Sequence, residues 1–124
     1  MSAGKHVFVV EDDRDIRESV VEVLEDEGYV VSAASDGREG LLLLRRATPK
    51  PDLILLDLMM PIMNGFQFRE EQRKDPELSA IPVVVITADV NARAKAESLG
   101  AAGFVQKPVK IQPLLDIIEQ HLPR

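Results

Sequence analysis

The chain has no cysteine among its 124 residues. It therefore has no disulfide framework, no thiolate metal site and no thiol nucleophile, which fits a reducing compartment. Long apolar runs are also missing: the stretch VFVV at residues 7–10 is too short for the core of a signal peptide, and no run approaches the length that crosses a bilayer. We expect a cytoplasmic protein that does not bind membranes.

Positive charge is in short supply, because 15 lysines and arginines face 21 aspartates and glutamates, giving a net charge of -6. This excess of acids disfavours non-specific attraction to nucleic acid or anionic lipid, so no direct nucleic-acid binding is expected, and cations or basic partners fit better. The hydrophobic share of 45% and charged share of 29% are typical of a folded protein. The length suits one hydrophobic core, and we expect a single domain over residues 1–124.

Short apolar runs alternate with helical patterns along the whole sequence. The predicted strands cover residues 6–10, 29–34, 52–56, 82–86 and 103–106. The predicted helices cover residues 16–27, 38–47, 64–74, about 90–99 and 111–122. Near-continuous apolar strands that alternate with helices indicate a parallel sheet covered on both faces. The predicted class is a doubly wound α/β fold with five βα units.

Polar residues stand where four of these strands end. Glu11 and Asp12 follow the first strand, Asp57 follows the third, Thr87 follows the fourth, and the fifth reaches Lys107. Open sheets of this class bind ligands beyond the carboxyl ends of their strands. In the flavodoxin-like strand order 2-1-3-4-5 the first and third strands are neighbours, roughly 5 Å apart. The three acids are then expected to share one pocket.

Such a pocket has a definite chemistry. Carboxylates in close contact repel one another, and a hard divalent cation such as Mg²⁺ relieves the repulsion while keeping water ligands. The ammonium of Lys107 and the hydroxyl of Thr87 suit an oxyanion. The set is therefore suited to hold a phosphoryl group, with Asp57 placed as the nucleophile that forms an acyl phosphate.

The polar residues that follow the strands also have ordinary interpretations. Asp13 and Asp15 are expected to be helix caps or turn residues. Thr87 and Lys107, taken singly, are ordinary residues of a strand end and a turn, so the functional interpretation depends on their convergence at one edge of the sheet. His6 and His121 have no partner at metal-ligand spacing, and we interpret both as structural or surface residues.

Four motifs together resemble the receiver domain of two-component response regulators, in particular single-domain receivers of the chemotaxis type. They are VFVVEDD (7–13), LILLDLMMPIMNG (53–65), VVVITA (83–88) and FVQKP (104–108). The resemblance covers essentially the whole chain. It implies a signalling protein, phosphorylated by a histidine kinase or a histidine phosphotransfer protein, that switches a surface recognised by a downstream effector and that can dimerise on phosphorylation. Such a protein is no metabolic enzyme, since it catalyses only its own phosphorylation and dephosphorylation.

The resemblance also implies roles for single residues around the metal. Asp57 is the phosphoacceptor, and Glu11 and Asp12 are the acidic pair of the Mg²⁺ site. In the family the second acid of the pair binds the metal directly and the first acts through water, which makes Asp12 the stronger ligand. The backbone carbonyl of Met59 completes the protein ligands.

Further implied roles concern the phosphoryl group and the switch. Lys107 and Thr87 contact the phosphoryl group, the Lys107-Pro108 peptide bond is cis, and Phe104 stands at the aromatic switch position. The expected output face consists of the helix after Thr87, the strand 103–106 and the last helix.

Several features bear on how well this chain fits the pattern. Glu11 has a longer reach than the aspartate of many members, and Phe104 lacks a tyrosine-type hydroxyl, so switching must work through packing. Met59 cannot hydrogen-bond an attacking water, which predicts a long-lived acyl phosphate; Asp89 is the nearby side chain that could still orient one.

Two helices have apolar surfaces of note. The alanine-rich helix at about 90–99 has only Val90, Ala94 and Leu99 as expected apolar contacts, so we expect it to be held less firmly than the others. The four leucines at positions 41–44 exceed what one helix face needs, and some of this apolar surface is expected to be exposed.

Three other functions compete with a phosphorylated receiver. A haloacid-dehalogenase-type phosphohydrolase needs a second aspartate where this chain has Met59. A flavodoxin-like cofactor carrier needs a glycine- and hydroxyl-rich phosphate loop, whereas EDDRD at residues 11–15 repels phosphate. A receiver-like interaction module that is never phosphorylated remains the alternative.

Overall fold

The computed structural model describes residues 4–122, in which five strands alternate with five helices. The strands are β1 (His6–Val10), β2 (Val30–Ala34), β3 (Leu53–Asp57), β4 (Val83–Thr87) and β5 (Gly103–Gln106). The helices are α1 (Arg14–Asp26), α2 (Gly37–Arg46), α3 (Gly65–Lys74), α4 (Ala92–Ser98) and α5 (Ile111–His121). Every predicted element is present, with ends that differ by a few residues.

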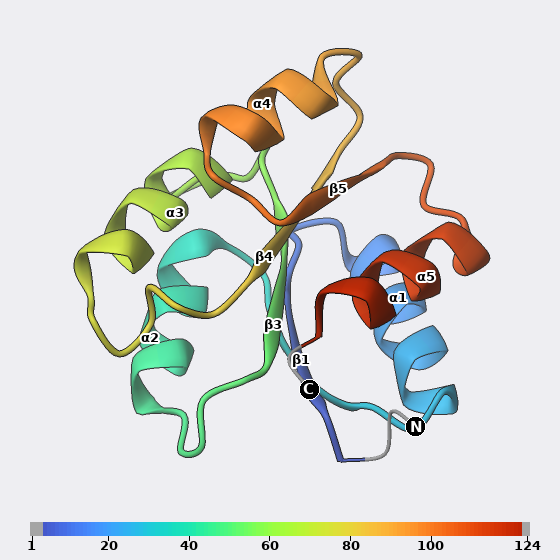
Figure 1. The fold of residues 1–124 in the computed structure, drawn as a ribbon, viewed down its shortest axis with the longest axis horizontal. Helices are drawn as coiled ribbons and strands as arrows, with labels where there is room; N and C mark the ends of the chain where they lie inside the picture. The colour runs from blue at the N-terminus through green and yellow to red at the C-terminus, as the bar shows by residue number, and fades with distance from the viewer. Residues whose placement is uncertain (1–3, 123–124) are drawn as a thin grey trace.

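The sheet has the order β2-β1-β3-β4-β5 with all neighbouring strands parallel, which confirms the doubly wound, flavodoxin-like prediction. Val10 is level with Leu56, and Asp57 is level with Ile86. The carboxyl ends of β1, β3 and β4 therefore lie together at one edge of the sheet, toward the top of Figure 1.

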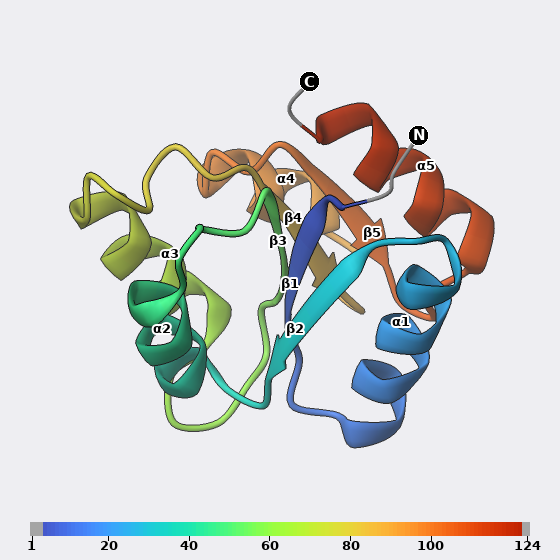
Figure 2. The ribbon, with the colours of Figure 1, turned by 90° about the horizontal axis from the view of Figure 1, so that it is seen from below.

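Helices cover both faces of the sheet. Figures 1 and 2 show α1 and α5 on one side and α2, α3 and α4 on the other. Alternate residues of each central strand point to opposite layers: in β1, Phe8 and Val10 pack toward α2, α3 and α4, whereas Val7 and Val9 pack toward α1 and α5. Both faces of the strand are thus buried, which is why its sequence is a continuous apolar run rather than an alternating one.

Two predictions about helix surfaces were wrong in detail. Val90 precedes α4 and is 88% exposed, and Ala94 is also exposed, so neither anchors this helix. Leu99, just beyond the last turn, is buried as predicted. The other buried contacts come from Ala92 and Ala96, because the helix is shorter and rotated relative to the expected face.

The sequence pattern of the last helix puts Ile111 on one apolar side with Leu114, Leu115, Ile118 and Leu122, and this placement of Ile111 is wrong. Ile111, the first residue of α5, is 59% exposed and does not share the buried side of that helix. In α2 the prediction is confirmed: Leu41 and Leu44 are buried, whereas Leu42 and Leu43 stay substantially exposed.

Candidate functional site

The turn between β1 and α1 places the first two acids. Glu11 is completely buried, and its Oε2 accepts a hydrogen bond from the Asp13 amide at 3.1 Å. Asp13 is the N-cap of α1, with Oδ1 accepting from the Ile16 amide at 3.0 Å, and Asp15 lies in the first helical turn, where an acid complements the helix dipole. These bonds fix the turn that carries Asp12, and Asp12 itself is exposed to solvent.

Asp57 is the last residue of β3, and the loop after it folds back tightly onto the strand. A Cβ on Gly65 would lie 2.5 Å from the carbonyl oxygen of Asp57, so only glycine lets α3 begin this close to the site. Asn64 caps α3 in a reciprocal capping box with Gln67. Ile62 has a φ of 68°, which is a strained left-handed conformation for a β-branched residue. It lies in the turn where the loop between β3 and α3 reverses its direction.

The structure brings the three predicted acids together. Glu11, Asp12 and Asp57 each offer a carboxylate oxygen, and these oxygens lie within 4.8 Å of one another. Asp57 is only 1% exposed. Among the described residues, Asp57 Oδ2 and Glu11 Oε1 are buried side-chain oxygens without a hydrogen-bond partner. Clustered hard oxygen donors, two of them without a hydrogen bond, fit a small divalent cation such as Mg²⁺.

This crowding changes the protonation of Asp57. Burial raises its pKa from the usual 3.8 to about 8, helped by hydrogen bonding with Glu11 and Asp12 and by the negative charge of Glu11, while the charge of Lys107 works in the opposite direction. The metal-free pocket therefore favours a proton on Asp57 near neutral pH, in the place where a cation would otherwise balance the charge.

Lys107 supplies the positive charge of the pocket. Its Nζ forms ion pairs with Glu11 Oε1 at 2.9 Å and with Asp57 Oδ1 at 3.4 Å. The contact with Glu11 Oε1 does not have the geometry of a hydrogen bond. Burial lowers the pKa of Lys107, but Glu11 and Asp57 outweigh it and the net shift is upward, which keeps the ammonium charged. The Lys107-Pro108 bond is cis, as predicted, and the Lys107 amide donates to the Thr87 carbonyl at 2.8 Å.

Thr87 ends β4 and is 1% exposed. Its Oγ1 accepts a hydrogen bond from the Asp89 amide at 3.1 Å. The carboxylate of Asp89 accepts from Lys95 Nζ at 2.6 Å and from the Asn91 amide at 2.7 Å, and the bond with Lys95 lowers its pKa. Asp89 is therefore engaged with α4, and Lys95 is a partner that the sequence analysis missed.

With this geometry established, the comparisons with known proteins decide the family. A sequence profile described as the response regulator receiver domain matches residues 7–119. The chain belongs to this family. The receiver is 35% identical to Protein PilH of Pseudomonas aeruginosa, over 90% of this chain and 93% of that protein. Its fold matches the chemotaxis response regulator CheY4 of Vibrio cholerae with a TM-score of 0.88 and 31% identity, covering 97% of this chain and all of the other.

Receiver domains are also found within longer proteins. The chain is 37% identical to the response regulator MprA of Mycolicibacterium vanbaalenii but spans only 46% of it, and it spans 7% of a hybrid signal transduction histidine kinase of Dictyostelium discoideum. The family works in two-component signalling with histidine kinases and downstream effectors, and its members are signalling domains rather than metabolic enzymes. None of the receiver's described helices is long and apolar enough to span a bilayer.

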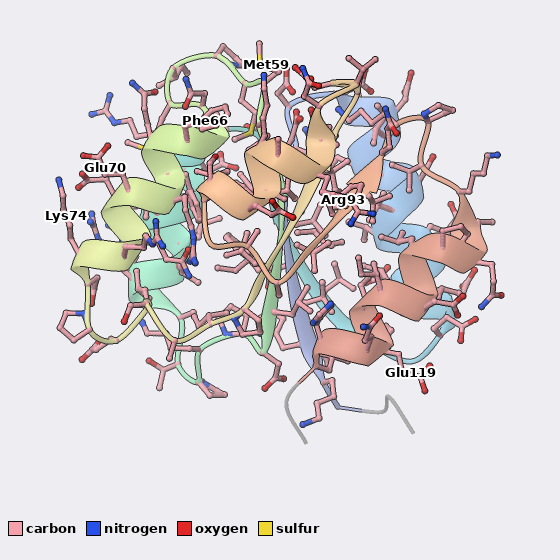
Figure 3. The ribbon with its side chains drawn as sticks, turned by 45° about the horizontal axis from the view of Figure 1, so that its top comes forward. Met59, Phe66, Glu70, Lys74, Arg93 and Glu119 are labelled. Atoms are coloured by element: carbon pink, nitrogen blue, oxygen red, sulfur yellow. The ribbon has the colours of Figure 1, made fainter. Side chains whose placement is uncertain are left out.

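Two further residues complete the receiver's pocket and its surroundings. Met59 is 70% exposed at the rim of the site, visible at the top of Figure 3, and its amide donates to Asp57 Oδ1 at 3.3 Å. Phe104 is partly buried against the core, and the Arg93 guanidinium lies 5.8 Å from its ring centre, between α4 and β5. Phe104 is thus placed to respond to movements of α4.

The two histidines lie away from this chemistry. His6 is in contact with Ser32 through Nε2 and Oγ at 2.8 Å, at the opposite end of β1, and burial lowers its pKa. His121 is partly buried at the end of α5. These positions accord with the structural roles predicted for both.

Proposed function

We propose that the chain is the phosphoacceptor of a two-component phosphorelay in the cytoplasm, acting as one receiver domain over its 124 residues. Asp57 takes a phosphoryl group from a phosphohistidine of a partner kinase or phosphotransfer protein, in a reaction that requires Mg²⁺. The observation that carries this proposal is the buried Asp57 carboxylate, with one oxygen unpartnered, enclosed by Glu11, Asp12 and Lys107.

The transfer step follows from this arrangement. An oxygen of Asp57 attacks phosphorus; a P–O bond forms while the P–N bond to the donor imidazole breaks, and the imidazole leaves with the electron pair. Asp12, Asp57 and the Met59 carbonyl would hold Mg²⁺, with Glu11 acting through a water. The bound metal supplies positive charge that offsets the carboxylates and the phosphoryl oxygens. Lys107 exchanges its contact with Asp57 for one with a phosphoryl oxygen.

The switch begins at Thr87. When its hydroxyl turns to a phosphoryl oxygen, it gives up the hydrogen bond from the Asp89 amide. Asp89 is tied to Lys95 in α4, and Gln106 Nε2 in β5 donates to the Asp89 carbonyl at 3.2 Å, so movement of this loop reaches both elements. The proposed output surface is therefore α4, β5 and α5, read by a downstream effector or by a second phosphorylated copy.

A groove between α1 and the start of α5 suits the phosphodonor. It has a volume of about 660 Å³ and is lined by apolar side chains, including Ile16 and Val109, and by the exposed acids Asp15, Glu22 and Asp26. An apolar lining beside exposed acids favours a partner helix that carries basic residues beside an apolar stripe. The groove lies on the side of the sheet covered by α1 and α5, next to Pro108 of the site.

The test is incubation with acetyl phosphate and Mg²⁺, followed by intact-mass measurement. The expected result is one phosphoryl group per chain, lost in Asp57→Asn and when a chelator removes the metal. The matched control is Asp52→Asn, because Asp52 directly precedes β3 at the end of the strand away from the site. This variant should be phosphorylated normally. Undiminished phosphorylation of Asp57→Asn would refute the assignment, and no adduct on the parent protein would favour the unphosphorylated interaction module.

A further inference from the structure

Arg17 in α1 contacts the acidic turn without contacting its carboxylates. Its Nη1 donates to the backbone carbonyl of Glu11 at 2.9 Å and is 3.3 Å from that of Asp12. Both carbonyls belong to the residues whose side chains enter the pocket. The guanidinium therefore fixes the orientation of two successive peptide groups immediately beneath the acidic pair.

Arg17 is the fourth residue of α1, and its side chain reaches back to the turn that precedes the helix. Among the described residues, its guanidinium forms no ion pair with Glu11, Asp12 or Asp57, and the cation that contacts Glu11 and Asp57 is Lys107. The carboxylate oxygens of the three acids lie within 4.8 Å of one another, with Arg17 bonded to the backbone of the turn and not to this group.

We propose that Arg17 is a positioning residue for the metal site. By holding the Glu11 and Asp12 carbonyls on the α1 side of the turn, it directs the Asp12 carboxylate toward Asp57. It does so without supplying a competing counter-charge to the acids. This inference rests on the proposed function, since it concerns the Mg²⁺ site of the unphosphorylated protein.

A purely electrostatic effect of Arg17 and a positioning effect predict opposite changes in Mg²⁺ affinity, which makes the proposal testable. If Arg17 acted only as a nearby positive charge, then Arg17→Gln would remove repulsion and tighten Mg²⁺ binding. If it positions Asp12, the same change loosens the ligand set, and loss of a group that orients a metal ligand costs about tenfold in affinity. Arg14→Gln is the matched control: Arg14 lies in the first turn of the same helix and pairs with Glu18 at 3.0 Å in solvent.

The experiment is calorimetric titration of the full chain with MgCl₂, using the parent, Arg17→Gln and Arg14→Gln. We expect Mg²⁺ to bind Arg17→Gln about tenfold more weakly and Arg14→Gln no more weakly than the parent. Phosphorylation by acetyl phosphate should return to the parental rate in Arg17→Gln at saturating Mg²⁺, because Asp57 and Lys107 are intact. Metal-free thermal unfolding of each variant reports whether the fold is retained.

The outcomes separate this inference from the proposed function. If the parent binds no Mg²⁺, the proposed metal site itself fails. If the parent binds Mg²⁺ and Arg17→Gln binds it equally or more tightly, the positioning role is wrong while the metal site stands. If Arg17→Gln unfolds, Arg17→Lys, which keeps the charge on a shorter side chain with a different donor geometry, should still lose affinity; parental affinity in that folded variant would overturn the proposal.

Discussion

Single residues in the pocket carry charges that burial makes costly. Asp57 and Glu11 are almost fully buried, and among the described residues Lys107 is the only cation that forms ion pairs with them. A pocket with more acids than cations is unfavourable for the isolated protein, because a buried charge requires a partner. A bound divalent cation would relieve this imbalance, and the imbalance itself should have a measurable effect on stability.

The first prediction concerns the pH dependence of the metal-free protein. The pKa of Asp57, raised to about 8 by burial and by Glu11 and Asp12 against the opposing charge of Lys107, means that the folded state keeps a proton that the unfolded state loses above 3.8. The folded state then binds more protons, so the contribution of Asp57 to the unfolding free energy falls as pH rises from about 4 to about 8.

Urea unfolding across this range, in parent and Asp57→Asn, measures the effect. The decline with pH should be smaller in Asp57→Asn, which has no carboxyl to titrate, and Mg²⁺ should offset it in the parent because the metal binds the folded, ionised site. An equal decline in both proteins would show that Asp57 does not carry the shift.

The second prediction concerns the lifetime of the phosphoryl group. Hydrolysis needs a water aligned with phosphorus, and Met59 at the rim offers no hydrogen bond to hold one. The nearby Asp89 carboxylate is paired with Lys95 of α4. Met59→Asn should accelerate dephosphorylation by about tenfold, equivalent to ~1.4 kcal/mol of barrier, in a time course of phosphoprotein decay. Decay at the parental rate would show that water positioning here does not set the lifetime.

The sequence predicted the site residues at strand ends, and missed two cations that bind the loops around them. Asp57, Thr87 and Lys107 could be placed because strand ends converge at one edge of a parallel sheet. Arg17 and Lys95 could not, because the direction of their acceptors, two backbone carbonyls for Arg17 and a loop carboxylate for Lys95, depends on the folded turns.

Among the helices, α4 is held very differently at its two ends. At its C-terminal end, buried Arg69 of α3 donates to the carbonyls of Leu99 at 2.9 Å and Gly100 at 3.0 Å, supplying a cation where the helix dipole favours one. At its N-terminal end Asn91 makes no side-chain capping bond. The end held by Arg69 lies away from Thr87. The other end is tied to the loop after Thr87 through Asp89, which accepts from the Asn91 amide and from Lys95, so a movement of that loop would reach α4 at its N-terminal end.

The third prediction tests this anchor by stability. Arg69→Met leaves the Leu99 and Gly100 carbonyls and Gln72 Oε1, a 2.8 Å partner, without their donor. Because unsatisfied buried acceptors are costly, the unfolding free energy should fall by about 2–4 kcal/mol in urea titrations. Arg73→Met, which changes an exposed arginine of the same helix, should cost less than about 1 kcal/mol. Equal effects would show that burial of Arg69 contributes nothing specific.

The fourth prediction concerns the mobility of α4. We expect its amides to exchange faster than those of α1, which buries Val20 and Leu24, whereas α4 buries only alanines along its length. Phosphorylation should change exchange mainly in residues 88–95. Equal protection of the two helices, unaffected by phosphorylation, would contradict the arrangement described here.

The presence of each helix could be predicted from the sequence, but the side of α4 that is buried could not. The pattern of its sequence offers alanines on several sides, so periodicity alone could not distinguish Ala92 and Ala96 from Ala94 as the buried set. The choice depends on Leu99 and the Arg69 contacts beyond the last turn. The other helices carry larger apolar residues, such as Phe68 in α3 and Leu114 in α5, and apart from Ile111 at the start of α5 their buried faces agree with the pattern.

For the whole molecule, the order of the strands assembles the pocket. Placing β1 between β2 and β3 brings Glu11 and Asp12 beside Asp57, and placing β4 and β5 next in order adds Thr87 and Lys107. The fold class followed from the sequence because buried parallel strands have distinctive apolar runs, whereas the strand order came from the flavodoxin-like topology and not from the runs themselves.

The charge of the molecule bears on its partner. The net charge of -6 and the acidic residues that line the groove between α1 and α5 favour a basic partner, whose association should weaken as salt is raised.

The most direct test of the account is to identify the phosphorylated residue chemically. The protein is phosphorylated with acetyl phosphate and Mg²⁺, reduced with borohydride, which converts an acyl phosphate to an alcohol, and digested for peptide mass spectrometry. The account predicts homoserine at position 57 and at no other aspartate, with none formed when Mg²⁺ is chelated. Reduction at Asp12 or another acid, or phosphorylation that leaves Asp57 unchanged, would contradict it.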